Sequence, residues 1–110
     1  MTGNEYQKAA LRTAGGMVCD KLLTNGVLGL CGESGEAADM VKKHLFQGHD
    51  LDREKLGKEL GDVAWYLAVT AYAIGYTLDE ILQMNVDKLW KRYPEGFAAE
   101  RSLHREAESK

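Results

Sequence analysis

The sequence predicts an all-α protein, an antiparallel bundle of four helices. Three observations favour this fold class. The chain has one proline, Pro94, and before it glycines separate long segments in which apolar residues recur at helical spacing. No segment alternates apolar and polar residues as a half-buried strand does. Amphipathic helices joined by short loops typically pack as an antiparallel bundle.

The first half of the chain predicts two helices. The first covers about residues 4–14 and is capped by its first residue, an asparagine, until Gly15-Gly16 stops it. Residues 15–24 are expected to form a loop or an irregular lead-in. The second helix is expected over about residues 25–46 and ends at Gly48.

The second half predicts two more helices. Asp50 or Asp52 can cap a helix over about residues 53–74, and Gly75 suits the left-handed conformation that ends it. Thr77-Leu-Asp-Glu80 is a capping box, which starts a fourth helix that runs to about Tyr93.

Length and composition indicate one soluble domain over residues 1–110, in which residues 98–110 form a polar tail or a short helix. The net charge is −3 and no basic cluster is present, so nucleic acid is not an expected partner. No apolar run reaches the ~18 residues that a membrane span requires. With no basic segment followed by an apolar run at the N-terminus, a cytoplasmic location is expected.

Two acidic pairs break the pattern of apolar residues inside and charged residues outside. Glu33 and Glu36 belong to one predicted helix, and Glu59 and Asp62 belong to the next. Residues three apart share a helix face, so each pair presents two carboxylates one turn apart.

The two pairs lie at similar angles to the apolar stripes of their helices. With about 3.6 residues per turn, Glu33 lies roughly 75° from the centre of its stripe and Glu59 roughly 70° from its own. Antiparallel packing would therefore bring four carboxylates together at the edge of the core. The stripes are formed by Leu30, Ala37, Val41 and Leu45 in one helix and by Leu56, Leu60, Val63, Leu67 and Ile74 in the other.

Converging carboxylates repel each other, and partial burial raises their pKa values further. A divalent cation removes both penalties. Hard oxygen ligands without histidine or cysteine at these spacings favour Mg²⁺, or Mn²⁺, over zinc and copper. Gly32, Gly35 and Gly61 beside the acids suggest close approach by a ligand or a neighbouring helix. For either pair alone, a solvated helix face is the alternative interpretation.

These residues resemble those of the MazG-like nucleoside triphosphate pyrophosphohydrolases, an all-α superfamily. The resemblance covers about residues 4–97 and implies cleavage between the α- and β-phosphorus atoms, with Mg²⁺ held by both acidic pairs. One departure is that Gly32 stands where the fuller family motif has another acid, which puts a second or third metal in doubt. The matching segments are Asn4-Glu-Tyr-Gln7, Leu28-Gly-Leu-Cys-Gly-Glu-Ser-Gly-Glu36, Glu59-Leu-Gly-Asp-Val-Ala-Trp-Tyr66 and Lys91-Arg-Tyr-Pro-Glu-Gly-Phe97.

In the chemistry that this resemblance implies, a metal-bound water attacks a nucleoside triphosphate. Glu33 or Glu36 could accept the proton of that water, and the sequence leaves both open. Tyr66, four residues after Asp62, could stack on the base or contact the sugar, although a tyrosine at the core edge fits equally.

Polar and basic residues supply further candidate substrate contacts. Asn85, Lys88 and Arg92 share a face of the fourth helix, and similar residues in the family touch phosphates. A solvated basic face is the alternative. Lys42 and Lys43 also suit the negative end of the second helix dipole, which gives them a reason to be there without a substrate.

A non-catalytic helical protein that binds metal or nucleotides through carboxylates is the competing hypothesis. Ferritin-like sites use Glu-x-x-His, and no histidine stands three residues after a candidate ligand here.

The working unit is expected to be a homodimer or homotetramer. Trp65 and Val69 fall near 240° and 280° on the third helix, away from its apolar stripe, and Tyr72 and Tyr76 extend that side. A two-fold interface would bury this face. The alternative is that the first helix and the C-terminal segment cover it within one chain.

Overall fold

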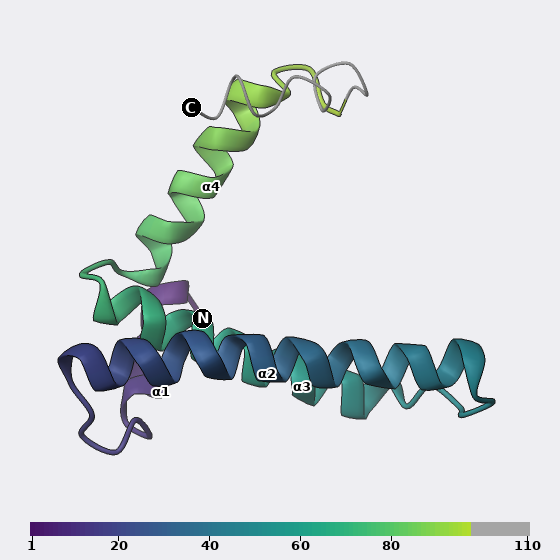
Figure 1. The fold of residues 1–110 in the computed structure, drawn as a ribbon. Coiled ribbons are helices and arrows are strands. Elements are labelled where there is room, and N and C mark those ends of the chain that lie inside the picture. The colour runs from purple at the N-terminus through teal and green to yellow at the C-terminus, as the bar shows by residue number, and fades with distance from the viewer. Residues whose placement is uncertain (98–110) are drawn as a thin grey trace. The chain divides into compact units, whose positions relative to one another are not determined.

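The computed structural model describes residues 1–97, which form four α-helices and no strand, apart from an isolated bridge between Pro94 and Gly96 (Figure 1). The all-α prediction is confirmed. The chain divides into two compact units, of which the first is Met1–Leu78 and the second begins at Asp79. The predicted tail over 98–110 lies outside the described residues. The helices are α1 (Gly3–Leu11), α2 (Cys19–Phe46), α3 (Arg53–Ala73) and α4 (Leu78–Arg92).

The N-cap of helix α1 lies two residues before the predicted one. Thr2, and not Asn4, is the N-cap, since its hydroxyl accepts from the Glu5 amide at 3.0 Å. The Glu5 carboxylate accepts in return from the Thr2 amide at 2.9 Å, which completes a capping box. The helix ends at Leu11, before the positive-φ Gly15 and Gly16.

Helix α2 begins at Cys19, so the prediction of a loop over residues 15–24 is wrong for its second half. Glycine disfavours helix interiors, so Gly26 and Gly29 would not be expected well inside a helix. In the structure both lie inside α2, where α3 packs against them. Tertiary contact therefore overrides the local propensity.

The ends of α3 agree with the predicted signals. Asp52 is the N-cap, and its Oδ1 accepts from the Lys55 amide at 3.0 Å. Gly75 follows the helix with φ +88°, while the Tyr76 amide donates to the Ala71 carbonyl at 2.9 Å. Helix α4 starts directly after Thr77, as predicted, and ends at Arg92.

The core of the first unit lies where α1 packs on the C-terminal half of α3. Val69 is fully buried, and the Trp65 indole donates to the Ala10 carbonyl at 3.2 Å and the Thr13 hydroxyl at 2.8 Å. The prediction that Trp65 and Val69 form an uncovered face is therefore wrong, because α1 covers it. The buried core residues are Ala10, Ala14, Leu22, Ala68, Val69 and Leu78.

One buried polar side chain connects three parts of this unit. Gln7 is 5% exposed, and its amide nitrogen donates to the carbonyls of Ala68 at 3.0 Å and Tyr76 at 3.1 Å. Its side-chain oxygen accepts from the Leu78 amide at 3.2 Å. Both the amide nitrogen and the oxygen of Gln7 are thus hydrogen-bonded, so its burial leaves no polar group unpaired. The same bonds hold α1 against the end of α3.

Helices α2 and α3 form an antiparallel hairpin and lie side by side along its length (Figure 1). Their contact is centred on small residues. A Cβ atom at Gly26 would overlap the Thr70 hydroxyl, and one at Gly29 would overlap the ring of Tyr66. The absence of side chains at these two positions therefore sets the distance between the helices and the face that each presents.

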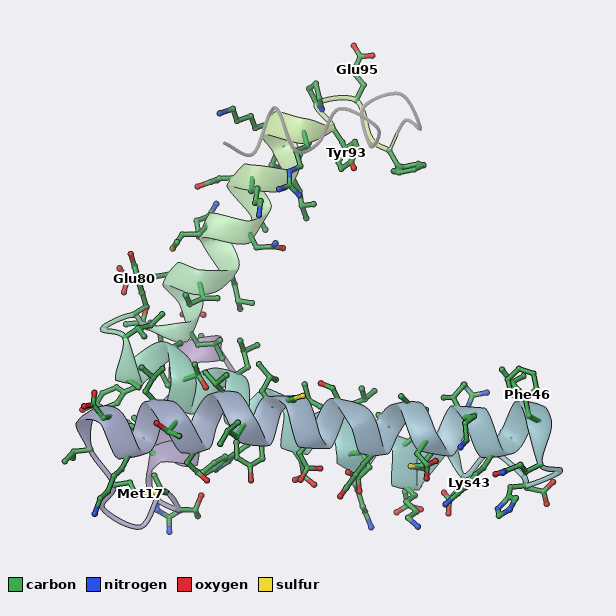
Figure 2. All side chains as sticks on the ribbon, in the orientation of Figure 1. Met17, Lys43, Phe46, Glu80, Tyr93 and Glu95 are labelled. Carbon is green, nitrogen blue, oxygen red and sulfur yellow. The ribbon has the colours of Figure 1, made fainter. Side chains whose placement is uncertain are left out.

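As a result, the apolar stripes do not form the centre of the hairpin contact as expected. On each helix the apolar stripe lies at a similar angle from the face that contacts the other helix. In an antiparallel pair, similar angles place both stripes on the same side of the hairpin. Leu60 is 56% exposed there and Leu45 is 64% exposed. Figure 2 shows how the side chains project from α2 up to Phe46.

The second unit contains α4, whose last turn carries Lys91 and Arg92 at the negative end of its dipole. After the helix, the rings of Tyr93 and Phe97 lie 5.5 Å apart. Across residues 1–97, no helix has the length and apolar character that crossing a bilayer demands.

Candidate metal and nucleotide site

The two acidic pairs meet in the middle of the α2–α3 hairpin. Glu33, Glu59 and Asp62 each offer a carboxylate oxygen, and these oxygens all lie within 4.8 Å of one another. Glu33 and Glu59 are half-buried, while Asp62 is exposed. Glu33 shares its helix face with Gly26 and Gly29, so it points directly at α3. Three of the four acids thus converge, half-buried or exposed, in the contact between α2 and α3.

The electrostatics show how unfavourable this arrangement is without a cation. The pKa of Glu33 is raised to about 7, first by a hydrogen bond between its carboxyl and that of Glu59. Loss of hydration and the charges of Glu36, Glu59 and Asp62 raise it further. The raised pKa means that Glu33 in this cluster binds a proton more readily than a separate carboxylate would.

The same residues leave ligand atoms without partners. Glu33 Oε2 and Glu59 Oε2 are buried, and neither has a hydrogen-bond partner among the described residues. Buried polar atoms normally have one. Oxygen-only donors that are anionic and closely spaced suit Mg²⁺ or Mn²⁺. The residues present therefore fit a divalent cation, which would satisfy both orphan oxygens and displace the shared proton.

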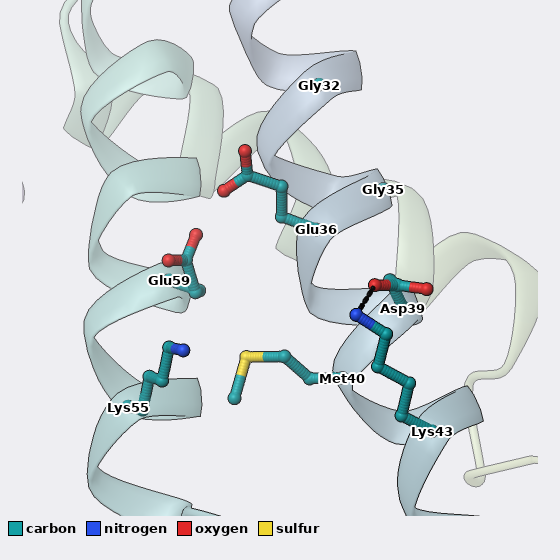
Figure 3. Close-up of a pocket in the computed structure, with 8 residues that line it drawn as sticks. All are labelled: Gly32, Gly35, Glu36, Asp39, Met40, Lys43, Lys55 and Glu59. Carbon is teal, nitrogen blue, oxygen red and sulfur yellow. Dashed lines mark ion pairs between the residues drawn. The ribbon is translucent and has the colours of Figure 1, made fainter. Parts of the chain in front are cut away.

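Glu36 lies one turn from Glu33 and belongs to the rim of this cluster. It is exposed and lines a groove of about 430 Å³ between α2 and α3, as does Glu59 (Figure 3). Gly32 and Gly35 line the same groove, and a Cβ atom at either would have no neighbour within 4 Å. Gly61 is equally open. Among the described residues, these glycines therefore leave open space on the side where a side chain would stand.

Tyr66 stands one turn beyond Asp62 in the same hairpin contact. Its ring lies against Gly29 and meets Trp65 edge to face, with ring centroids 5.0 Å apart. The side chain is half-buried. This position agrees with the core-edge interpretation and keeps Tyr66 close to the acids; contact with a nucleotide stays a prediction.

The predicted phosphate contacts on the fourth helix belong to the second unit. Asn85 and Lys88 are exposed and Arg92 is half-buried, and all three lie within α4. Their role with substrate also stays a prediction.

The structure brings Tyr6 and Lys55 close to the acids, although the sequence indicated no role for either. Tyr6 of α1 donates to the Gly61 carbonyl at 3.4 Å, and its pKa is raised by burial and by the charge of Asp62. Lys55 lines the groove together with Lys43, whose position the helix dipole also explains without a substrate. Spacing could have found the lysines, because Lys55 lies four residues before Glu59 and Lys43 seven after Glu36. Tyr6 belongs to the matching segment Asn4-Glu-Tyr-Gln7, but residue spacing does not place it beside the acids, since its position depends on how α1 packs.

Comparison with known proteins agrees with this arrangement. Residues 23–97 match the MazG nucleotide pyrophosphohydrolase domain, a segment that includes both acidic pairs. The chain is also 39% identical over 100 residues to the Gene 37 protein of Mycobacterium phage L5, with 83% of this chain and 88% of that protein covered. No solved structure shows a significant match.

The family match spans more than half of the chain, and three of the four acids that the family resemblance singled out, Glu33, Glu59 and Asp62, meet between α2 and α3. The chain belongs to the MazG nucleotide pyrophosphohydrolase domain family.

Proposed function

We propose that this protein is a Mg²⁺-dependent enzyme that hydrolyses nucleoside triphosphates to the monophosphate and pyrophosphate, as nucleotide-pool housekeeping. The observation that carries the proposal is the meeting of Glu33, Glu59 and Asp62 within 4.8 Å, with two buried oxygens unpaired. Membership of the MazG family supports the reaction class. Mn²⁺ would fit the same oxygen donors.

In this proposal Glu33, Glu36, Glu59 and Asp62 would hold the cation, which would supply a water of lowered pKa and positive charge against the phosphates. Water oxygen bonds to the α-phosphorus, and the bond from that phosphorus to the oxygen bridging to the β-phosphorus breaks. The electron pair leaves with pyrophosphate, and the proton of the water passes to a carboxylate.

Of the two candidate bases, Glu36 is favoured by its position. Glu33 is half-buried and bonded to Glu59, whereas Glu36 is exposed, lies outside the three-carboxylate cluster and lines the groove. A base needs access to the water that it deprotonates. Tyr66, Asn85, Lys88 and Arg92 are proposed to contact the nucleotide.

The products distinguish this reaction from its alternatives. With Mg²⁺ and each common nucleoside triphosphate, phosphorus NMR is expected to show monophosphate and intact pyrophosphate, and a chelator should stop their formation. Diphosphate with orthophosphate would reject the proposal and indicate a phosphatase-type reaction. Nucleotide binding without any product would favour the non-catalytic binding module, for which Gly32 in place of an acid is the only sequence sign.

We also propose that the working unit is a homodimer or homotetramer, assembled through a different face from the one first predicted. Since α1 covers Trp65 and Val69, the support comes from the apolar side of the hairpin, where Leu45 and Leu60 are more than half exposed. Wide apolar patches of this kind commonly mark interfaces. Sedimentation at micromolar concentration is expected to give at least twice the chain mass of 12.2 kDa. A fully active monomer would contradict it, and Leu60→Glu should weaken assembly.

A further inference from the structure

The groove beside the acids has an anionic end and a cationic end. Glu36 and Glu59 line one part, and Lys43 and Lys55 line the other, from α2 and α3 respectively (Figure 3). Met40 reaches across the floor between the two lysines. An adjoining groove of about 390 Å³ shares Met40 and both lysines and continues to the α2–α3 loop. Lys43 and Lys55 therefore lie on the loop side of Glu36 and Glu59, and Asp50 and Asp52 line the adjoining groove beyond them.

Lys55 is the less constrained of the two cations. Within residues 1–97 its ammonium group has no ion pair, and in Figure 3 the side chain turns from α3 toward the groove. Lys58, one turn further along the chain, differs: it pairs with Glu54 at 3.7 Å, does not line the groove and has a side chain that is 76% exposed. The charge of Lys55 is thus available to a ligand in the groove.

Lys43 faces Lys55 from the opposite wall and is held in place. Its ammonium pairs with Asp39 at 2.9 Å, and Asp39 also lines the groove. Lys42, its neighbour, pairs with the same carboxylate at 3.7 Å but lies outside the groove. Along the helix axes, at about 1.5 Å per residue, Lys55 lies about 6 Å from Glu59 and Lys43 about 10 Å from Glu36. A chain of linked phosphates could reach from the acids to both lysines.

We propose that Lys43 and Lys55 form the subsite for the β- and γ-phosphates, the part of the nucleotide that leaves as pyrophosphate. This inference rests on the proposed hydrolase function and deepens it, since it gives the substrate a direction in the groove. The α-phosphate lies at the carboxylates, and the diphosphate extends toward the α2–α3 loop. Both ammonium groups donate to diphosphate oxygens, which gain negative charge when the bond to the α-phosphorus breaks.

Binding of the two products tests the direction. Calorimetry with Mg²⁺-loaded protein would measure pyrophosphate and nucleoside monophosphate separately for Lys43→Met and Lys55→Met. Each variant is expected to bind pyrophosphate about tenfold or more weakly, and monophosphate as the wild type does, because each loses a charged hydrogen bond to diphosphate alone. Lys42→Met and Lys58→Met are the matched controls, with the same charge change outside the groove. All four lysines are exposed, so folding should be unaffected.

Several results would overturn the subsite. Unchanged pyrophosphate binding would do so, as would equal weakening in the controls, which would indicate a general effect of net charge. Weaker monophosphate binding with unchanged pyrophosphate binding would show the opposite direction, with the nucleoside over Met40. The binding assay needs no turnover: pyrophosphate binding that depends on these lysines in a protein without hydrolysis would support the subsite and reject the hydrolase function alone.

Discussion

Replacing Asp62 by asparagine is expected to abolish triphosphate hydrolysis while the protein stays folded, and Glu36→Gln is expected to do the same. Asp62 belongs to the cluster of three carboxylates, and Glu36 lines the groove beside it. Loss of a residue that only supports a metal ligand commonly lowers metal affinity or activity 10–100-fold. Loss of a ligand or of the base should therefore lower the rate of hydrolysis at least about a hundredfold. Initial rates at saturating Mg²⁺ measure the effect.

The control for this loss is Glu54→Gln, which removes a carboxylate from an exposed position of α3. It should keep the rate of the wild type. Full Mg²⁺-dependent activity in Asp62→Asn or Glu36→Gln would show that the residue is not part of the site.

The repulsion among these acids has a second readout that needs no substrate. The pKa of Glu33 is about 7 in the folded chain and near 4.5 when unperturbed. A raised pKa means that Glu33 binds its proton more tightly in the folded state than in the unfolded state. This proton binding stabilises the folded state fully below about pH 4.5, and the stabilisation is lost as the pH rises through 7. The melting temperature in chelator should therefore fall across this window, and less so in Glu33→Gln. Added Mg²⁺ should raise it at pH 8.

Gly26→Ala is expected to destabilise the fold, whereas the same change at Gly32 is not. A Cβ atom at position 26 would overlap the Thr70 hydroxyl and lie 3.3 Å from its Cβ and 3.4 Å from its Cα. The hydroxyl cannot rotate away freely, since it donates to the Tyr66 carbonyl at 2.6 Å. Overpacking of this kind costs about 1–3 kcal/mol, more than the better helix propensity of alanine returns.

Gly32 provides the matched control in the same helix, because a Cβ atom there meets nothing within 4 Å. Gly32→Ala should raise the unfolding free energy by up to about 1 kcal/mol. Denaturant unfolding compares the two variants, and Thr70→Ala should recover part of the loss in Gly26→Ala. Equal stabilisation by both alanines would mean that α2 and α3 do not meet at Gly26.

Local signals predicted the ends of the helices where the chain itself satisfies them. Asp52 caps α3 through its own first turn, and Gly75 adopts the left-handed conformation that ends it. The start of α2 was missed because Gly26 is a poor helix former in isolation. Its place within the helix is stabilised by α3, which no local pattern contains.

The sequence singled out the acids that lie together in the structure, but it did not predict how each of them is placed between the helices. Helical spacing and the family resemblance selected Glu33, Glu36, Glu59 and Asp62. The structure decided that Glu33 faces Glu59 across the hairpin and that Glu36 lies at the rim, in the groove that Lys55 also lines. Which acids become half-buried, and so which pKa is raised, depends on the angle at which each helix meets its neighbour.

The sequence by itself determined that the chain is helical, where α3 and α4 begin, and which acidic residues share a face, because these follow from contacts within a few residues. Tertiary structure alone decided which face of each helix is buried. The apolar stripes predicted that Leu60 and Leu45 face the core, but α2 and α3 approach each other at Gly26 and Gly29 on another face, and both leucines are more than half exposed. Helical periodicity gives the relative angles of residues on one helix, whereas the face that packs depends on the shapes of two helices together.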